Sequence, residues 1–196
     1  EQYSIQAETL MKAAVEDYVE IIKVVQASNA NMTLIKGVKI TLNGKPRRLV
    51  DVGDLRTGET ENELQVLVFN KDHIETLVEA INEAGFKTNV DDQFINIDVP
   101  DPSYKQLMEV VEDLQRKKNS AIGRLTKAKS EATTRARAAV ENEFIEQAIA
   151  SQASKKCDVH YDTYSGEISE VTDGKIREIL GEEFYKKFEE EQEMYG

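Results

Sequence analysis

Lysines and arginines gathered between positions 105 and 137 are the residues with the clearest chemical potential. This segment carries nine basic and four acidic residues, in a chain whose formal net charge is −12. Cations at helical spacing can bind the phosphates of a nucleic acid, which fixes position without reading sequence. On a helix, Arg116, Lys117, Arg124 and Lys127 would form one broad basic stripe. The segment is predicted to be the only part of the chain suited to phosphate binding.

An ordinary solvated helix face is the alternative for these cations. The flanking parts of the chain are acidic, with balances of −8 over residues 1–104 and −9 over residues 138–196. Their repulsion of phosphate argues against indiscriminate binding of nucleic acids. Any binding surface is therefore expected to be local.

Other chemistry finds little support in the sequence. Cys157 and His160 have ligand-like spacing, but a closed zinc site needs four ligands and no second such pair exists. His73 and His160 lie in unrelated segments, so no nucleophile–histidine arrangement is credible. Phosphate-cradling loop signatures are absent. We predict a protein that is not an enzyme, with no metal, no cofactor and no small-molecule substrate.

Long amphipathic helices are predicted at both ends of the chain. Apolar residues recur in steps of three and four over residues 4–29, and a heptad series covers 103–148. The stripe of the second helix comprises Leu107, Val111, Leu114, Ala121, Leu125, Ala128 and Ala132. Residues 151–166 show no clear period and are predicted to be a loop. A last helix is predicted from about Ser169 or Thr172, and no apolar run is long enough for a membrane span.

Strand patterns with one helix fill the middle of the chain. Strands are predicted at 38–42, 49–52, 64–69 and 94–99, with a hairpin turn at Asn43-Gly44. Residues 56–63 are predicted to be a loop. Asp72 is predicted to cap a helix over residues 73–84, which Gly85 ends. Pro100 and Pro102 close this region.

These elements predict an α+β fold, in which a long three-helix bundle carries a small α/β domain inserted between its first and second helices. Three amphipathic helices can bury their stripes only against one another. The bundle would comprise residues 1–31 and 103–196, and the inserted domain residues 35–100. The two connections, near 30–36 and 99–104, would act as hinges.

The order of these elements resembles the ribosome recycling factor family. Residues 7–11 (AETLM) are similar to its A-E-x-R-M, and residues 30–38 (ANMTLIKGV) to its A-N-P-A-L-L-D-G-I. Residues 80–85 (AINEAG) and 95–100 (INIDVP) are similar to A-I-x-x-S-x-L-G and I-R-V-P-I-P. Residues 171–179 (VTDGKIREI) are similar to L-T-D-K-x-I-K-E-I-D. The resemblance spans nearly the whole chain.

The resemblance implies a partner and a set of site residues. The bundle would bind the large ribosomal subunit and its rRNA, and an elongation factor G-type GTPase would act with it to split the subunits after termination. The implied rRNA contacts are Arg116, Lys117, Arg124, Lys127 and Lys129. The implied hinge residues are Ala30, Asn31, Met32, Pro100 and Pro102.

Departures from the family leave two further functions open. Residues 26–30 (QASNA) stand where the family has R-T-G-R-A, so both arginines are absent. This fits a mitochondrial matrix protein, with another organelle or the cytoplasm as alternatives, and the chain's start at Glu1 fits a removed targeting segment. It also fits a stably bound ribosomal or ribosome-assembly protein with the same fold. A helical adapter that binds proteins through its acidic last helix is the third possibility.

Overall fold

Two compact units make up the chain in the computed structural model, which describes residues 1–27, 29–60 and 62–196. Unit 1 consists of Glu1–Val25 and Val111–Gly196, and unit 2 of Gln26–Val110. The two ends of the chain therefore belong to one unit and its middle to the other. The predicted α+β class, long helices with a small sheet-containing insert, is confirmed.

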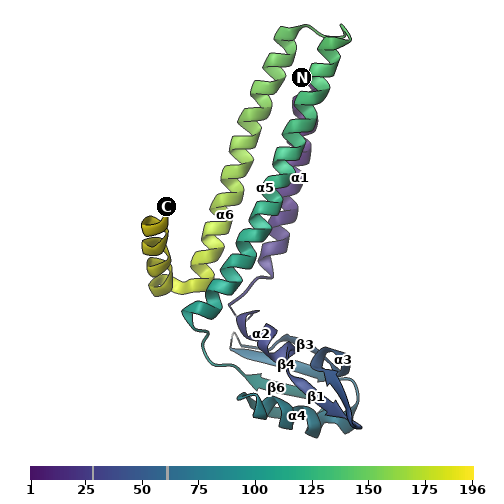
Figure 1. Ribbon diagram of the computed structural model, residues 1–196, viewed down its shortest axis with the longest axis vertical. Coiled ribbons are helices and arrows are strands. Elements are labelled where there is room, and N and C mark those ends of the chain that lie inside the picture. Colours follow the sequence, from purple (N-terminus) through teal and green to yellow (C-terminus); the bar gives the residue numbers. More distant parts are fainter. Residues whose placement is uncertain (28, 61) are drawn as a thin grey trace. The chain divides into compact units, whose positions relative to one another are not determined.

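Unit 1 is built from three long helices that lie side by side (Figure 1). They are α1 (Gln2–Lys23), α5 (Tyr104–Glu141) and α6 (Gln147–Tyr195). From Val111 onward, the apolar stripe predicted for the second helix is buried, including Leu114 and Leu125 with no exposed surface. Each such leucine contributes about 1.5–3 kcal/mol through removal of its surface from water. The predicted heptad spacing is confirmed by this burial.

Small buried side chains occur on both α1 and α6, which are in contact with each other. On α1 they are Ser4, Ala7 and Ala14, and on α6 they are Ala150, Ala153 and Cys157. The distance between two packed helix axes depends on the side chains at the contact, so small residues allow a close approach.

A buried hydrogen bond joins Tyr18 on α1 to Thr172 on α6. Thr172 Oγ1 also donates to the backbone oxygen of Ile168 at 2.6 Å. Because threonine has one hydroxyl hydrogen, the Tyr18 hydroxyl must be the donor in the bond between the two side chains. Burial raises the pKa of Tyr18, and the bond to Thr172 offsets part of that rise.

Replacing Thr172 by valine is expected to lower the free energy of unfolding by about 1–2 kcal/mol, because the Tyr18 hydroxyl loses its acceptor inside the unit. Tyr18→Phe is the matched control. It leaves Thr172 bonded to Ile168 and should cost about 0.5–1.5 kcal/mol, and the double variant should recover part of the Thr172→Val loss. Urea unfolding followed by circular dichroism measures all three. If Tyr18→Phe lowers the free energy of unfolding more than Thr172→Val does, Thr172 is the donor in the bond between the two side chains.

The predicted loop at 151–166 is wrong, as is the start of the last helix near Ser169 or Thr172. Helix α6 begins at Gln147, and the connection from α5 is the short stretch 142–146. The buried positions of α6 in this region are small or sulfur-bearing, such as Ala153 and Cys157, with half-buried His160 and Tyr164 further on. Alanine, histidine and tyrosine make a weaker apolar stripe than the leucines and valines of α5, so the helical period is harder to recognise in the sequence.

Helix α6 is broken at Gly181, which has φ 70° and ψ 171°. After it the chain turns sharply, and the final helical segment runs back in the opposite sense (Figure 1). Tyr185 Oη on that segment donates to Asp173 Oδ1 at 2.7 Å, and the Arg177 guanidinium lies 4.5 Å from the centre of the Tyr185 ring. Donation to Asp173 raises the pKa of Tyr185. These contacts attach the final segment to the preceding part of α6.

Unit 2 contains a four-stranded antiparallel sheet in the order β3-β4-β6-β5. Its strands are β3 (Gly53–Thr57), β4 (Glu63–Val68), β5 (Lys87–Asp91) and β6 (Phe94–Asp98). Alternate residues of β4 and β6 form one core with Leu77 and Ile81 of α4 (Ile74–Glu83). Every second residue of these strands is therefore buried, and these residues pack against one face of α4.

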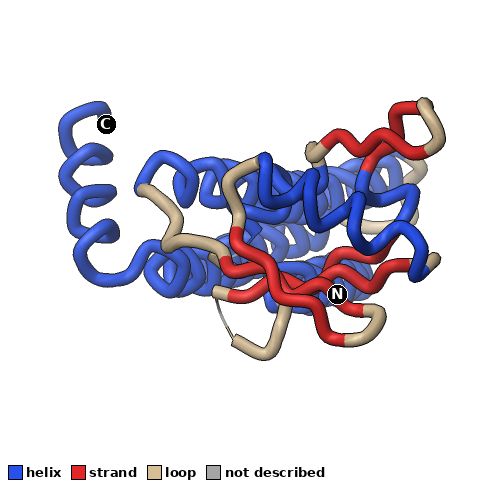
Figure 2. Tube along the Cα trace, turned by 90° about the horizontal axis from the view of Figure 1, so that it is seen from below, coloured by secondary structure: helices blue, strands red, loops and turns tan. Residues whose placement is uncertain are grey.

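The rest of unit 2 lies between α1 and β3 in the sequence. It comprises α2 (Asn29–Lys36), β1 (Lys39–Leu42), β2 (Lys45–Arg48) and the single-turn helix α3 (Leu49–Val52). A 3₁₀ turn, η1 (Lys71–His73), precedes α4. Strands β1 and β2 pair with each other and form a two-stranded sheet separate from the larger one (Figure 2). Ile35 and Ile40 bring α2 and β1 into the common core.

Several predictions for unit 2 are confirmed. Strands occur at the predicted places for β1, β4 and β6, and α4 matches the predicted helix. Asn43 and Gly44 have φ values of 52° and 72°, as the two-residue hairpin turn requires. Gly85 has φ 97° and follows the end of α4, where only glycine is easily accommodated.

Other predictions for unit 2 are wrong. Residues 49–52 form a helical turn, because the Asp51 carboxylate accepts the backbone N–H of Arg48 at 3.1 Å. The predicted loop 56–63 is too long, since residues 56 and 57 belong to β3 and residue 63 to β4. Residues 58–60 and 62 do connect the strands, and residue 61 lies outside the described residues. Strand β5 was missed because its residues are polar and mostly exposed. Asp72 is not the cap: Asn70 accepts the Asp72 backbone N–H at 3.0 Å instead. None of the helices in the described ranges is long and apolar enough to cross a membrane.

Candidate functional site

The basic residues predicted on the second helix all lie on α5, and each has an acidic neighbour. Two of them reach other helices of unit 1. Arg124 lies 2.8 Å from Asp17 of α1, and Lys129 lies 2.6 Å from Asp158 of α6. Lys129 also sits 5.0 Å from the centre of the Tyr161 ring, and its bond to Asp158 raises its pKa. These two cations therefore contact neighbouring helices through partly exposed ion pairs.

The other three cations pair along α5 itself. Arg116 lies 3.9 Å from Glu112, Lys117 2.5 Å from Asp113, and Lys127 3.9 Å from Glu131. The side chains of Arg116 and Lys127 keep 75% and 77% of their surface exposed. Exposed pairs of this kind contribute little to stability and can exchange one anion for another. A phosphate can replace these carboxylates without disturbing the fold.

The five predicted residues do not share one face of α5. Lys117, Arg124 and Lys127 follow one another at spacings of seven and three, which keeps them on one side. Lys129 is five residues beyond Arg124, a rotation of roughly 140° around the helix. Lys129 contacts α6, whereas Arg124 contacts α1, so the two side chains lie on different sides of α5 as that rotation requires. The candidate phosphate-binding stripe therefore comprises Arg116, Lys117, Arg124 and Lys127.

A shallow depression of about 250 Å³ lies beside this stripe, between α1 and α5. It is lined by Leu10, Arg124, Lys127, Ala128 and Glu131. Leu10 is 52% exposed, so an apolar side chain stands next to two cations. Such a surface can hold a phosphate against the cations and a sugar or base against the leucine.

The predicted hinge residues occupy two different kinds of backbone within unit 2. Ala30, Asn31 and Met32 lie inside α2, whereas Pro100 and Pro102 lie in the irregular stretch before α5. The buried Asn31 side chain donates to the backbone oxygen of Pro100 at 3.4 Å, so the two groups are linked. Met32 packs against the core of the unit.

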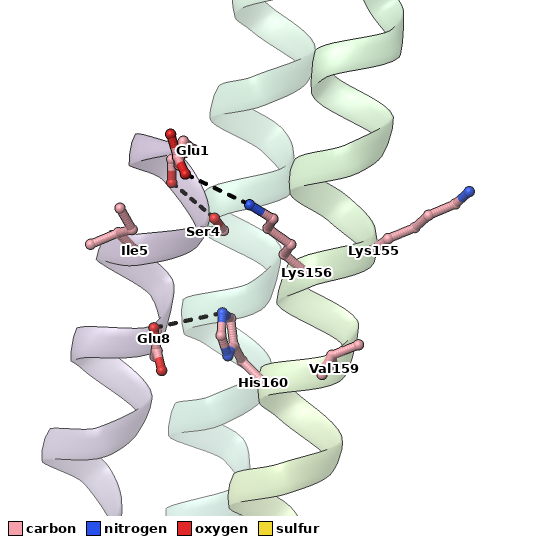
Figure 3. Close-up of a pocket in the computed structure, with 8 residues that line it drawn as sticks. All are labelled: Glu1, Ser4, Ile5, Glu8, Lys155, Lys156, Val159 and His160. Carbon is pink, nitrogen blue, oxygen red and sulfur yellow. Dashed lines mark hydrogen bonds and ion pairs between the residues drawn. The ribbon is translucent and has the colours of Figure 1, made fainter.

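A cavity of about 440 Å³ opens between the start of α1 and α6 (Figure 3). Its charged groups lie near one another: Lys156 Nζ is 4.0 Å from Glu1 Oε1, and His160 Nε2 is 3.7 Å from Glu8 Oε2. Ser4 donates to the Glu1 backbone oxygen at 2.8 Å, and Lys155 extends away from the group (Figure 3). The charged groups of the cavity are thus arranged in two long ion pairs, with one hydrogen bond beside them.

The spacing of Cys157 and His160 does not produce a metal site. Cys157 is buried, and burial raises the pKa of its thiol. His160 is directed to Glu8 of α1. Among the described residues, no three histidine, cysteine or acidic side chains are grouped as metal ligands.

Sequence reasoning missed a second group of cations, in unit 2. Five lysines and arginines fall between positions 36 and 48, at the end of α2 and in the β1–β2 hairpin. The balance of −8 over residues 1–104 did not reveal these five cations, because acidic residues elsewhere in that segment outnumber them. The visible signal was the absence of any Asp or Glu from position 24 to position 50.

Comparison with known proteins gives one consistent result. The family model described as "Ribosome recycling factor" matches residues 19–180. A ribosome-recycling factor of Chlamydia caviae is 22% identical over 174 residues, which cover 88% of this chain and 94% of the relative. A ribosome-recycling factor of Chlamydia abortus is 23% identical over 116 residues, covering 58% of this chain and 64% of the relative.

The fold is also similar to a solved one. A solution structure of the ribosome recycling factor superposes with a TM-score of 0.53 at 23% sequence identity. The match covers 92% of this chain and 97% of that chain. The family match ends at residue 180, so the segment after the Gly181 break lies outside it.

Proposed function

The chain belongs to the ribosome recycling factor family, and from that membership we propose that it binds the large ribosomal subunit and promotes subunit splitting after termination. Its partner would be a translocase GTPase of the elongation factor G type. The family match over residues 19–180 carries this proposal.

Binding would be made by the stripe on α5. Arg124 and Lys127 stand beside Asp17 and Glu131 on exposed surface, so rRNA phosphates can take the place of those carboxylates. The acidic surroundings would limit this contact to a small number of phosphates, because the chain as a whole carries −12. The interaction is therefore expected to be sensitive to salt.

The energy for splitting would come from the partner's GTP, and the chain would contribute no catalytic step. Three packed helices provide a stiff body. The connections near 30–36 and 99–104, which lie on the unit 2 side of the two junctions between the units, would provide the hinges. The bond from Asn31 to Pro100 ties the two connections together, which supports a coupled movement of both. A stiff body and a biased hinge suffice to transmit a partner's motion.

Arg124→Glu/Lys127→Glu is expected to reduce cosedimentation with large subunits about tenfold or more at low salt, since each lost phosphate contact lowers both affinity and salt dependence. Cosedimentation over a potassium chloride series, with wild type and variant, measures this. A subunit-splitting assay with the GTPase then reads the function directly.

Asp17→Asn is the matched control for that variant. It breaks the same ion pair with Arg124 but keeps both cations, so it should retain or strengthen ribosome binding. If Asp17→Asn instead loses binding as the double variant does, the ion pair matters only for the bundle and the α5 stripe is not the contact.

The same experiment separates the two alternative functions. A stably bound ribosomal or assembly protein would stay on one subunit through high salt and would not turn over. A helical adapter would show no salt-sensitive association even at low salt, which would exclude the recycling function.

We also propose that the protein acts in the mitochondrial matrix. The family's arginines are missing at residues 26–30, which suits a ribosome whose RNA differs from the bacterial one. Imaging of the tagged full-length protein tests this, and a signal confined to the cytosol would exclude it.

A further inference from the structure

The β1–β2 hairpin of unit 2 carries a concentration of positive charge that the stripe on α5 does not account for. No acidic residue occurs between positions 24 and 50, in a chain with 37 acidic residues. The same stretch contains five cations: Lys36, Lys39, Lys45, Arg47 and Arg48. All five are exposed. The hairpin is thus a local basic surface on an acidic protein.

The register of the hairpin places like charges opposite each other. Lys39 of β1 pairs directly with Arg48 of β2, so these two cations share one face of the hairpin. Lys45 and Arg47 pair with Leu42 and Ile40, so they lie on the other face. Side chains directly opposite in an antiparallel pair have Cβ atoms about 4.5–5.5 Å apart, and like charges there are destabilising. An anion bound between them would relieve that repulsion.

Acidic partners are scarce for these cations, in contrast with those of α5. Within the described ranges, the only acidic side chain within 4.0 Å of any of the five is Asp51, which lies 3.4 Å from Arg48. The bond from the Arg48 backbone holds the pKa of Asp51 below its usual value, and the Arg48 side chain adds to this. Among the described residues, Lys36, Lys39, Lys45 and Arg47 form no ion pair, and Arg47 acts on Asp51 only through its charge. Within the described ranges, Asp51 is the one internal competitor that a polyanion would meet there.

The surface suits phosphates better than an acidic protein. Val38 and Ile40 are buried in the core of unit 2 and Leu42 is half-buried, so the exposed side chains of residues 39–48 are polar, charged or Pro46. A protein interface needs an apolar centre, whereas phosphate contacts need only positioned donors. Arg47 and Arg48 add guanidinium groups, which can hold phosphate through two bonds at once.

We infer that the β1–β2 hairpin is a second RNA-binding element, which binds the phosphate backbone of ribosomal RNA through Lys39 and Arg48 on one face and Lys45 and Arg47 on the other. This inference rests on the proposed function for its target but on different residues from the α5 stripe. With contacts in both units, the protein would hold RNA at two places along its chain.

Protection of a strand edge is the competing explanation for these charges. Lysines and a proline on an exposed edge strand prevent pairing with another chain, and β2 has both. That role requires charge of either sign, whereas phosphate binding requires positive charge. Substitutions that remove the charge and substitutions that reverse its sign, at the same positions, therefore distinguish edge protection from phosphate binding.

The test uses the full chain with Lys45→Gln/Arg47→Gln and Lys45→Glu/Arg47→Glu. The control is Lys12→Gln/Lys87→Gln, which removes the same charge from exposed positions of α1 and β5. Affinity is measured over a salt series for salt-washed ribosomal subunits free of tRNA and mRNA, and for rRNA extracted from them. Size-exclusion chromatography reports self-association of each variant.

The Gln pair is expected to lose about tenfold in affinity for both targets at low salt and to lower the slope against log salt by about 2, since two phosphate contacts are removed. The Glu pair should lose more, and the control little. Loss on subunits without loss on extracted rRNA would overturn the inference in favour of an acidic protein. Self-association of the Gln pair alone, with RNA affinity intact in both variants, would leave edge protection as the only role. Wild type that binds extracted rRNA but no ribosomal subunit would refute the proposed function and leave RNA binding by the hairpin in place.

Discussion

Ile97→Ala is expected to lower the free energy of unfolding of unit 2 by about 2–5 kcal/mol. Ile97 has no exposed surface, pairs with Leu64 of β4 and Thr88 of β5, and belongs to the same core as Leu77 and Ile81. Its removal leaves a cavity that the sheet cannot close, because neighbouring strands hold its backbone on both sides. Unit 2 is small, so this loss is a large part of its stability.

Hydrogen exchange measured by mass spectrometry locates the effect. Peptides from β4, β6 and α4 should exchange faster in the variant, while those from α1 and α6 should not change, because each unit has its own core. Asp98→Ala is the control, an exposed position on the same strand that should change stability by no more than about 0.5 kcal/mol. Equal effects of the two substitutions would show that the sheet does not bury Ile97.

Gly181→Ala is expected to cost about 1–3 kcal/mol, since its φ of 70° and ψ of 171° lie in a region open almost only to glycine. No atom lies within 4 Å of where the new Cβ would be, so the cost comes from the backbone alone. The variant has two ways to respond. It can keep the turn with strain, or extend α6 and lose the contacts of Tyr185 with Asp173 and Arg177.

Gly174→Ala is the matched control in the same helix, with the opposite expected sign. Gly174 is exposed, has ordinary helical backbone and has no atom within 4 Å of the new Cβ. Alanine there should raise the free energy of unfolding by about 0.5–1 kcal/mol through lower backbone entropy in the unfolded chain. Thermal and urea unfolding of the two variants compare them directly. Stabilisation by Gly181→Ala as well would mean that the break in α6 is not required by the fold.

Local patterns accounted for much of the fold. The Asn43-Gly44 turn, the strands around it and the end of α4 at Gly85 each depend on the conformations open to one or two residues. The heptad series of α5 depends on spacing within one helix. Such features act over a few positions, so they can be recognised without knowing what the rest of the chain does.

The remaining misses have one physical cause. Residues 151–166 form part of a helix whose buried side includes alanine and cysteine, and β5 is an edge strand of polar residues. Their structure depends on the neighbouring helix or strand that covers them, and not on a hydrophobic contrast of their own. Tertiary contacts override weak local preference in both places.

The candidate site divides in the same way. The sequence alone determined that cations gather on α5 and that the chain resembles the recycling factors. It also contains no recognisable motif for a metal site or a catalytic pair. Only the tertiary structure decided which cations are neutralised. Asp17 reaches Arg124 across 107 positions of sequence, while the hairpin cations meet few carboxylates in the described ranges. Charge acts through space, so a count along the chain cannot tell which positive groups remain available to phosphate.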